Sequence, residues 1–286
     1  GDVYKRQGFA ALWRISEGNR AEAETANERL SVFKYGATMQ VAHKNWQDGN
    51  FIEMDALLDA ADPNLHGWEW QYLNRFRDLS LFSLKGHTKA LISAQFSYDG
   101  KSIVTASYDN TAKVWDAKAG TEFFTIKGHN APILSATFSP DGKRILTASD
   151  DKTAKVWDTK TGAEIFTIVG HKRTVYSAQF SPDGRQIITF SNDNTAQVWD
   201  AKNGKQLFSL KGNTGGVICA HFSLDEIRII TASQDNTARV WDAKTGKELL
   251  SLKGHSIGLN SAKFSPDGNY IVAVGTDRIT RMWDAK

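Results

Sequence analysis

The chain has 286 residues, enough for one large domain or two of ordinary size. Hydrophobic residues make up 41% and charged residues 23%, which is typical of a globular protein and excludes a disordered or fibrous chain. A net charge of +3, from 35 basic and 32 acidic residues, is too balanced to indicate a nucleic-acid partner.

Targeting and anchoring segments are not found in the sequence. The longest apolar runs fall far short of the roughly 20 residues that span a bilayer, and no segment has the pattern of a signal peptide. The single cysteine, Cys219, excludes an intramolecular disulfide and a multi-cysteine metal site, and it fits a reducing compartment. We therefore expect a cytoplasmic protein; the alternative is a membrane anchor in a missing N-terminal segment.

Residues 1–79 have a helical pattern after a short foreign-looking start. Residues 1–7, GDVYKRQ, resemble translated adapter sequence, so we set them aside as non-native and expect the natural N-terminus to be missing. In the lead-in at 8–79, three segments have apolar residues at helical spacing. The turn sequences QDGN (47–50) and DPN (62–64) separate them. The sequence predicts a short α-helical hairpin region before the repeats.

Residues 80–286 repeat one unit every 42 residues. Trp-Asp pairs begin at 115, 157, 199, 241 and 283, and each interval is 42 (157 − 115 = 42). Gly-His pairs fall on the same period at 86, 128, 170 and 254, with Gly212-Asn213 in the remaining slot. In the first copy, runs at 91–96, 102–106, 112–116 and 122–126 are separated by Gly, Asp and Asn turns, which predicts four short antiparallel strands.

These features resemble the WD-repeat family, in which Gly-His opens and Trp-Asp closes a repeat of roughly 40–45 residues. The resemblance covers residues 80–286 without insertions or deletions between copies. It implies an all-β propeller of four-stranded antiparallel blades, with five repeats in this chain, stacked so that only short strand edges are exposed.

Closure of the propeller ring has two interpretations. LFSL (81–84) matches the outer strand that ends the other copies, whereas the last copy stops at Lys286, before its own outer strand. Residues 81–84 would then complete the last blade and close a ring of five. Because the family usually closes with seven blades, we favour a fragment of a larger propeller, with strand edges free to pair with other chains.

A set of His, Ser, Asp and Trp recurs in the first three copies. A hydrolase needs one such constellation beneath one oxyanion hole, so three copies indicate a structural role. The resemblance implies a buried hydrogen-bond chain in which the indole donates to the serine, the serine bonds the histidine and the histidine meets the aspartate. The residues are His87, Ser107, Asp109, Trp115, His129, Ser149, Asp151, Trp157, His171, Ser191, Asp193 and Trp199.

The last two copies depart from this pattern. Asn213 replaces the histidine of the fourth copy and Gly275 replaces the serine of the fifth, so we expect both networks to be broken and both blades to be softer. Glu226 stands where the other copies have a turn glycine. A non-glycine residue there favours a remodelled or less stable turn.

Function in this architecture lies on the faces of the blades, since the strands are used in packing. The family commonly binds peptides or protein surfaces on its top face, around the central channel, through two positions per repeat. These positions vary here while the rest of the repeat is nearly constant, and Tyr108 and Tyr176 are the best anchor candidates. The ten positions are Ile92, Tyr108, Leu134, Asp150, Tyr176, Asn192, Ile218, Gln234, Asn260 and Thr276.

The sequence thus predicts a non-catalytic scaffold whose partners are other proteins or peptides, with no cofactor, no metal and no catalytic residue. An enzyme built at the channel mouth would need a unique cluster of carboxylates, histidines or metal ligands, which the non-repeating polar residues do not supply. Nucleic-acid binding through Lys113, Lys155, Arg239 and Arg281 is disfavoured, because aspartates alternate with these cations.

An alternative function comes from the lead-in. Its Ala/Glu-rich helix and its G-W-E-W-x-Y-L segment at 67–73 resemble those that precede the first blade in large bacterial WD-repeat proteins, serine/threonine kinases among them. The chain would then be the regulatory or sensory C-terminal part of a larger bacterial kinase. No Gly-rich phosphate loop, H-R-D or D-F-G element occurs in the sequence, so a kinase domain would lie upstream.

Overall fold

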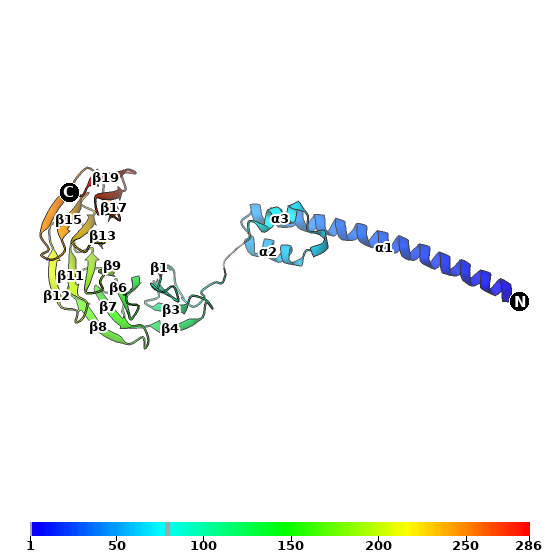
Figure 1. The fold of residues 1–286 in the computed structure, drawn as a ribbon, viewed down its shortest axis with the longest axis horizontal. Helices are drawn as coiled ribbons and strands as arrows, with labels where there is room; N and C mark the ends of the chain where they lie inside the picture. Colours follow the sequence, from blue (N-terminus) through cyan, green and yellow to red (C-terminus); the bar gives the residue numbers. More distant parts are fainter. Residues whose placement is uncertain (1, 78–80) are drawn as a thin grey trace. The chain divides into compact units, whose positions relative to one another are not determined.

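The computed structural model describes residues 2–77 and 81–286 (Figure 1). The chain divides into two units, residues 1–81 and residues 82–286, and each has its own hydrophobic core. The predicted boundary between residues 79 and 80 falls within 78–80, which lie outside the described residues.

Helices form the first unit. They are α1 (Asp2–Gln47), α2 (Phe51–Ala60), the 3-10 turn η1 (Pro63–Leu65) and α3 (Trp68–Asn74). Residues 2–7, set aside in the sequence analysis, continue α1, and their side chains lie outside the described residues. Met39, Met54, Leu58 and Leu73 are buried together where the three helices meet. The lead-in is therefore a packed helical unit.

Five antiparallel sheets form the second unit, one for each repeat. The first four sheets have four strands each, hydrogen-bonded in chain order, and the fifth has three. The predicted four-stranded blade is thus confirmed for four of the five repeats. The strands are β1 (Leu91–Phe96), β2 (Ser102–Ser107), β3 (Ala112–Asp116), β4 (Glu122–Ile126), β5 (Ile133–Phe138), β6 (Arg144–Ser149), β7 (Thr153–Asp158), β8 (Glu164–Val169), β9 (Val175–Phe180), β10 (Gln186–Ser191), β11 (Ala196–Asp200), β12 (Gln206–Leu210), β13 (Val217–Phe222), β14 (Arg228–Ser233), β15 (Ala238–Asp242), β16 (Glu248–Leu252), β17 (Leu259–Phe264), β18 (Tyr270–Gly275) and β19 (Thr280–Asp284).

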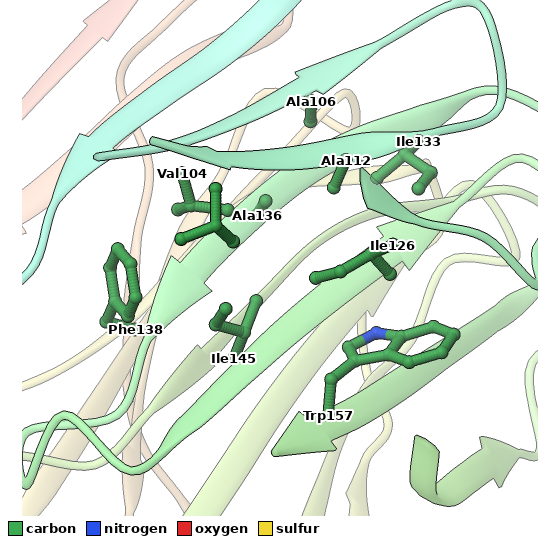
Figure 2. Packing of buried hydrophobic residues seen from close by; sticks show 10 residues of the cluster. Val104, Ala106, Ala112, Ile126, Ile133, Ala136, Phe138, Ile145 and Trp157 are labelled. Atoms are coloured by element: carbon green, nitrogen blue, oxygen red, sulfur yellow. The ribbon is translucent and has the colours of Figure 1, made fainter. Parts of the chain in front are cut away.

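The core of this unit lies between successive blades. Val104, Ala112 and Ile126 of the first blade are buried against Ile133 and Trp157 of the second (Figure 2). Equivalent positions form the core at the three following interfaces. Because the middle blades bury both faces, strands such as β10 lack the alternation of a half-exposed sheet. Each large apolar side chain buried there contributes about 1.5–3 kcal/mol, so neighbouring blades hold each other in place.

The first and last blades each leave one face uncovered. Leu91 and Phe96 of β1 are 54% and 61% exposed, although the residues at their positions in β5 are buried. In the last blade Val272 and Met282 are 40% and 69% exposed. The described blades therefore form an open arc, visible in Figure 1 from β1 to β19.

Residues 81–84 do not form the predicted closing strand. They belong to none of the sheets of the described residues. Phe82 lies instead against Gly120 of the first blade, as Phe124 lies against Gly162 of the second. Phe82 therefore packs on the first blade in the way that the outer-strand residue Phe124 packs on the second. Residues 81–84 do not pair with β19. Closure of a five-bladed ring by these residues is wrong for this structure, and a larger ring stays a prediction.

Glu226 keeps the turn of the fourth blade. Its φ is 60°, close to the 67° of Gly142 and the 70° of Gly268, and its N–H donates to Ser223 O at 3.0 Å. The expected remodelling of this turn is therefore wrong. The left-handed conformation is retained, and for a residue with a Cβ it costs about 1 kcal/mol.

Candidate functional site

A buried chain of hydrogen bonds crosses each of the first three blades. In the second blade the Trp157 indole donates to Thr147 Oγ1 (2.8 Å), which lies 2.8 Å from His129 Nε2, and His129 Nδ1 lies 2.7 Å from Asp151 Oδ2. With the proton assigned to Nδ1, the indole, the hydroxyl and the imidazole each donate once. The first and third blades repeat this chain with His87, Thr105, Asp109 and Trp115, and with His171, Thr189, Asp193 and Trp199.

The hydroxyl in the chain belongs to a threonine, so the predicted serine link is wrong. Ser149 Oγ instead donates to the backbone carbonyls of Ala131 (3.1 Å) and Pro132 (2.9 Å) and accepts the Asp151 N–H (3.1 Å). Ser107 and Ser191 likewise donate to carbonyls of the preceding loop. The serines therefore tie the loop before the first strand of a blade to the turn after the second strand.

The pKa values of the aspartates of these chains, and of His171 in the third, are lowered. Burial alone would raise the pKa of Asp151, but hydrogen bonds from His129 and Thr153 hold it well below its usual range. Burial lowers the pKa of His171, although Asp193 opposes that shift. The imidazole is therefore neutral at pH 7, with both nitrogens engaged by side chains of its own blade.

The fourth blade replaces the missing imidazole with a guanidinium. Arg239 Nη1 donates to Asn213 Oδ1 at 2.9 Å and to Asp235 Oδ2 at 3.0 Å. The Trp241 indole still donates to Thr231 Oγ1 at 2.9 Å. The chain is nevertheless interrupted, as expected, because Asn213 Nδ2 is buried without a partner and Arg239 joins only the loop to the turn.

In the fifth blade the chain is interrupted at a position different from the predicted one. Ala273 stands where the other blades have threonine, so His255 Nε2 is buried without a partner, while His255 Nδ1 lies 2.9 Å from Asp277. Gly275 leaves room for the histidine, since a Cβ there would lie 2.8 Å from the imidazole. Thr276 Oγ1 donates to a loop carbonyl at 3.1 Å, as the serines do in the other blades.

The first set of predicted binding positions forms five β-bulges. In the first blade Leu91 pairs with Ser107 and Ser93 with Ala106, which leaves Ile92 as the extra residue. A bulge turns a side chain out of the strand register and is common beside functional sites. The same shift in the other blades leaves unpaired Leu134, Tyr176, Ile218 and Asn260.

The second set is fixed beside the first by backbone hydrogen bonds. The Tyr108 N–H donates to Ala90 O at 3.0 Å, two residues before the bulge. The same bond is made by Asp150, Asn192, Gln234 and Thr276. We call the ends of the blades that carry these ten positions the top face. Tyr108 is 46% exposed, whereas Tyr176 packs in part on the core between the third and fourth blades.

A groove of about 330 Å³ opens on the top face between the fourth and fifth blades. Ile218, Gln234, Asn260 and Thr276 line it together with Gly258. A Cβ on Gly258 would lie 3.2 Å from Gln234 Cα, so the glycine allows the two blades to approach closely. The structure thus brings four of the ten predicted positions into one groove and places the other six around the arc.

Polar side chains of the innermost strands, which the sequence analysis did not single out, link neighbouring blades. His221 Nδ1 lies 2.8 Å from Gln179 Oε1, and Gln95 Oε1 accepts the Phe138 N–H at 3.1 Å. Burial, aided by the charge of Lys263, lowers the pKa of His221 to about 4. The signal in the sequence is a polar residue at the fifth position of the first strand of every repeat, at Gln95, Thr137, Gln179, His221 and Lys263.

Comparison with known families gives the same period as the blades. The family model of the WD domain, G-beta repeat, matches residues 79–116, 120–158, 162–200, 204–242 and 246–284. The chain belongs to the WD-repeat family. WD domains generally mediate interactions between proteins. The second to fifth matched segments each cover the outer strand of one blade and the first three strands of the next, so one WD repeat straddles two blades. No match to the chain was found among curated proteins.

The four cations considered above for nucleic-acid binding are paired within their own blades. Lys113 and Lys155 lie 2.7 and 2.8 Å from a glutamate, and Arg239 and Arg281 lie 3.0 and 3.1 Å from an aspartate. This arrangement differs from the basic stripe of a nucleic-acid interface. Residues 2–77 and 81–286 contain no group of three or more His, Cys, Asp or Glu that could hold a metal ion. No helix among those same residues has the length and apolar character to cross a membrane.

Proposed function

We propose that this WD-repeat protein is a non-catalytic scaffold that binds peptides or protein surfaces on its top face. The row of five bulges carries the proposal. Each blade turns one variable side chain out of strand register and fixes a second one beside it on a constant frame. A recognition surface of this kind changes its contacts without disturbing the packed core.

The groove between the fourth and fifth blades supports an extended peptide as the ligand. Ile218 offers an apolar contact, while Gln234, Asn260 and Thr276 offer donors and acceptors suited to a peptide backbone. The histidines of the buried chains support binding over catalysis. In the first three blades both imidazole nitrogens are occupied by side chains of the same blade, so none is free to accept a proton from a substrate.

Peptides selected from a display library on the full chain test the proposal. The variants Tyr108→Ala and Gln234→Ala are expected to weaken the selected peptides at least tenfold when combined, about 1.4 kcal/mol or more. The control combines Tyr98→Ala and Tyr270→Ala, which removes two exposed tyrosines (69% and 48%) at the opposite ends of the strands. Equal peptide affinities for the wild type and both double variants would refute binding at the top face.

A further inference from the structure

An arginine clamp closes the interface between the second and third blades. The Arg144 guanidinium lies 5.0 Å from the ring centroid of Phe180. It donates to the carbonyl of Gly184 at 3.0 Å and also to the carbonyl of Ala201. Two carbonyls and one ring of the third blade thus form a seat for a guanidinium from the second.

The same seat is occupied between the fourth and fifth blades. The Arg228 guanidinium lies 4.9 Å from the Phe264 centroid and donates to Gly268 O at 2.6 Å and to Ala285 O at 2.8 Å. Arg228 is two repeats beyond Arg144 (228 − 144 = 84, twice 42). The clamp is therefore a recurring interaction with the same acceptors each time.

Between the third and fourth blades the seat is present and the arginine is not. Gln186 holds the clamp position, one repeat after Arg144 (186 − 144 = 42). Phe222, Glu226 and Ala243 hold the positions of the ring and of the two carbonyls. A hollow of about 450 Å³ opens there, lined by Gln186, Glu226 and Ala243 among others. Its size is ample for the planar head of an arginine.

Glu226 adds a negative charge that the two occupied seats lack. Their turns have glycine at this position, whereas Glu226 holds a φ of 60° in the same turn. Residues held in sparsely populated backbone conformations cluster at ligand sites, where the side chain has a use that offsets the strain. Since Glu226 lines the hollow, this seat has an acidic residue where the two occupied seats have glycine.

The charge around the hollow is negative on balance. Three carboxylates and two cations line it: Asp183, Glu226, Asp242, Arg185 and Lys244. Burial would raise the pKa of Asp183, but hydrogen bonds from Ser181 and from the Arg185 N–H lower it, so the carboxylate is charged at pH 7. The Arg185 side chain lies 3.7 Å from Asp183 but is 87% exposed, so water screens this pair strongly. At the occupied seat, Asp225 lies 3.8 Å from Arg228 and corresponds to Asp183.

We propose that this hollow is a binding site for a guanidinium cation, supplied by an arginine side chain of a partner polypeptide or by free arginine. The guest donates to the carbonyls of Glu226 and Ala243 and pairs with the carboxylates of Glu226 and Asp183. Arginine fits this seat better than lysine, because its planar fork donates to two acceptors at once.

The site is separate from the top face. Val175 pairs with Ser191 at the top end of β9, and Phe180 pairs with Ile187 at the other end, next to the hollow. The two binding sites therefore lie at opposite ends of the same strands. A negative result at the peptide groove would therefore leave the proposed guanidinium site untouched, and the reverse is also true.

Titration of the full chain with N-acetyl-arginine methylamide tests the proposal, with binding measured by calorimetry and located by amide chemical shifts. We expect shifts at Glu226 and Ala243, and at least tenfold weaker binding of the citrulline analogue, which has the same shape without the charge. The lysine analogue is expected to bind more weakly as well. Free L-arginine is the second arm: binding of the free amino acid alone identifies a small-molecule guest, and binding of the capped form identifies a polypeptide arginine.

Two variants separate binding from folding. Gln186→Arg places an arginine of the chain itself in the seat and should weaken binding of the capped arginine at least tenfold. Glu226→Gly should weaken it about tenfold while raising the melting temperature by a few degrees, because glycine relieves the left-handed strain. Ser102→Arg, at the same register position two repeats earlier, is the matched control and should leave binding unchanged. Equal binding of the arginine and citrulline analogues, no binding of either form of arginine, or unaltered binding by Gln186→Arg overturns the proposal.

Discussion

Replacing Thr147 by alanine removes the hydroxyl that joins the Trp157 indole to the His129 imidazole. These side chains are buried, with exposures of 0% for Thr147, 2% for Trp157 and 6% for His129. The change leaves an indole N–H and an imidazole nitrogen without partners, at about 1–3 kcal/mol each, and deletes a methyl group worth about 0.8 kcal/mol. We therefore expect Thr147→Ala to lower the free energy of unfolding by about 3–7 kcal/mol.

Urea unfolding measures this loss, and amide hydrogen exchange assigns it to the second blade, since stacked repeats open locally. The reciprocal variant Ala273→Thr gives His255 Nε2 the partner that it lacks and should raise stability by about 1 kcal/mol. Ser149→Ala is the control: it loosens the loop but should leave the Trp157 indole N–H resonance in place. A loss below about 1 kcal/mol for Thr147→Ala, or an indole shift caused by Ser149→Ala alone, would refute the threonine link.

Acid is expected to destabilise the fold through His221, whose pKa is about 4 when folded and 6.5 otherwise. The unfolded chain binds more protons between these values, so the stabilisation from neutral His221 is complete above pH 6.5 and is lost toward pH 4. The free energy of unfolding should fall by about 2–3 kcal/mol between pH 7.5 and pH 4.5 for this reason. The urea midpoints at these two pH values should therefore differ less in His221→Gln than in the wild type. Gly204→Ala should lower the free energy of unfolding by about 1–3 kcal/mol in the same assay, because φ is +71° and the new Cβ would lie 2.7 Å from Phe166. The control is Gly36→Ala, which lies in a helix with nothing within 4 Å of the new Cβ and should not destabilise the protein. Amides of the fifth blade should exchange faster than those of the second to fourth; equal protection in all of them would contradict the role assigned to the interrupted chain.

The strands were predictable because turn residues bound each apolar run closely. The run at 91–96 is β1 with the same bounds, and the run at 112–116 is β3. The linking hydroxyl was not predictable from spacing, since Thr105 and Ser107 lie two residues apart on the same face of β2. Strand register decides between them: Trp115 pairs with Ile103, so Thr105 is the diagonal neighbour of the indole and Ser107 lies one step further away.

The role of Gln186 was beyond the reach of the repeat pattern. The clamp position carries serine, arginine, glutamine, arginine and tyrosine in the five copies, which is indistinguishable from drift at a surface position. Its meaning depends on acceptors in the next blade, 40 and 57 residues ahead of Arg144. Contacts at such separations are set by the stacking of blades, and the sequence of one repeat does not contain them.

The equivalence of the two arginine clamps has a consequence for the gene as well as for the protein. Removing two consecutive repeats would bring the second blade directly onto the fifth, and Arg144 would meet Phe264, Gly268 and Ala285 in place of its present acceptors. A gene that lost these two repeats would thus encode an array whose new junction keeps an arginine clamp. Its protein would present a different combination of top-face residues without any change in the remaining blades.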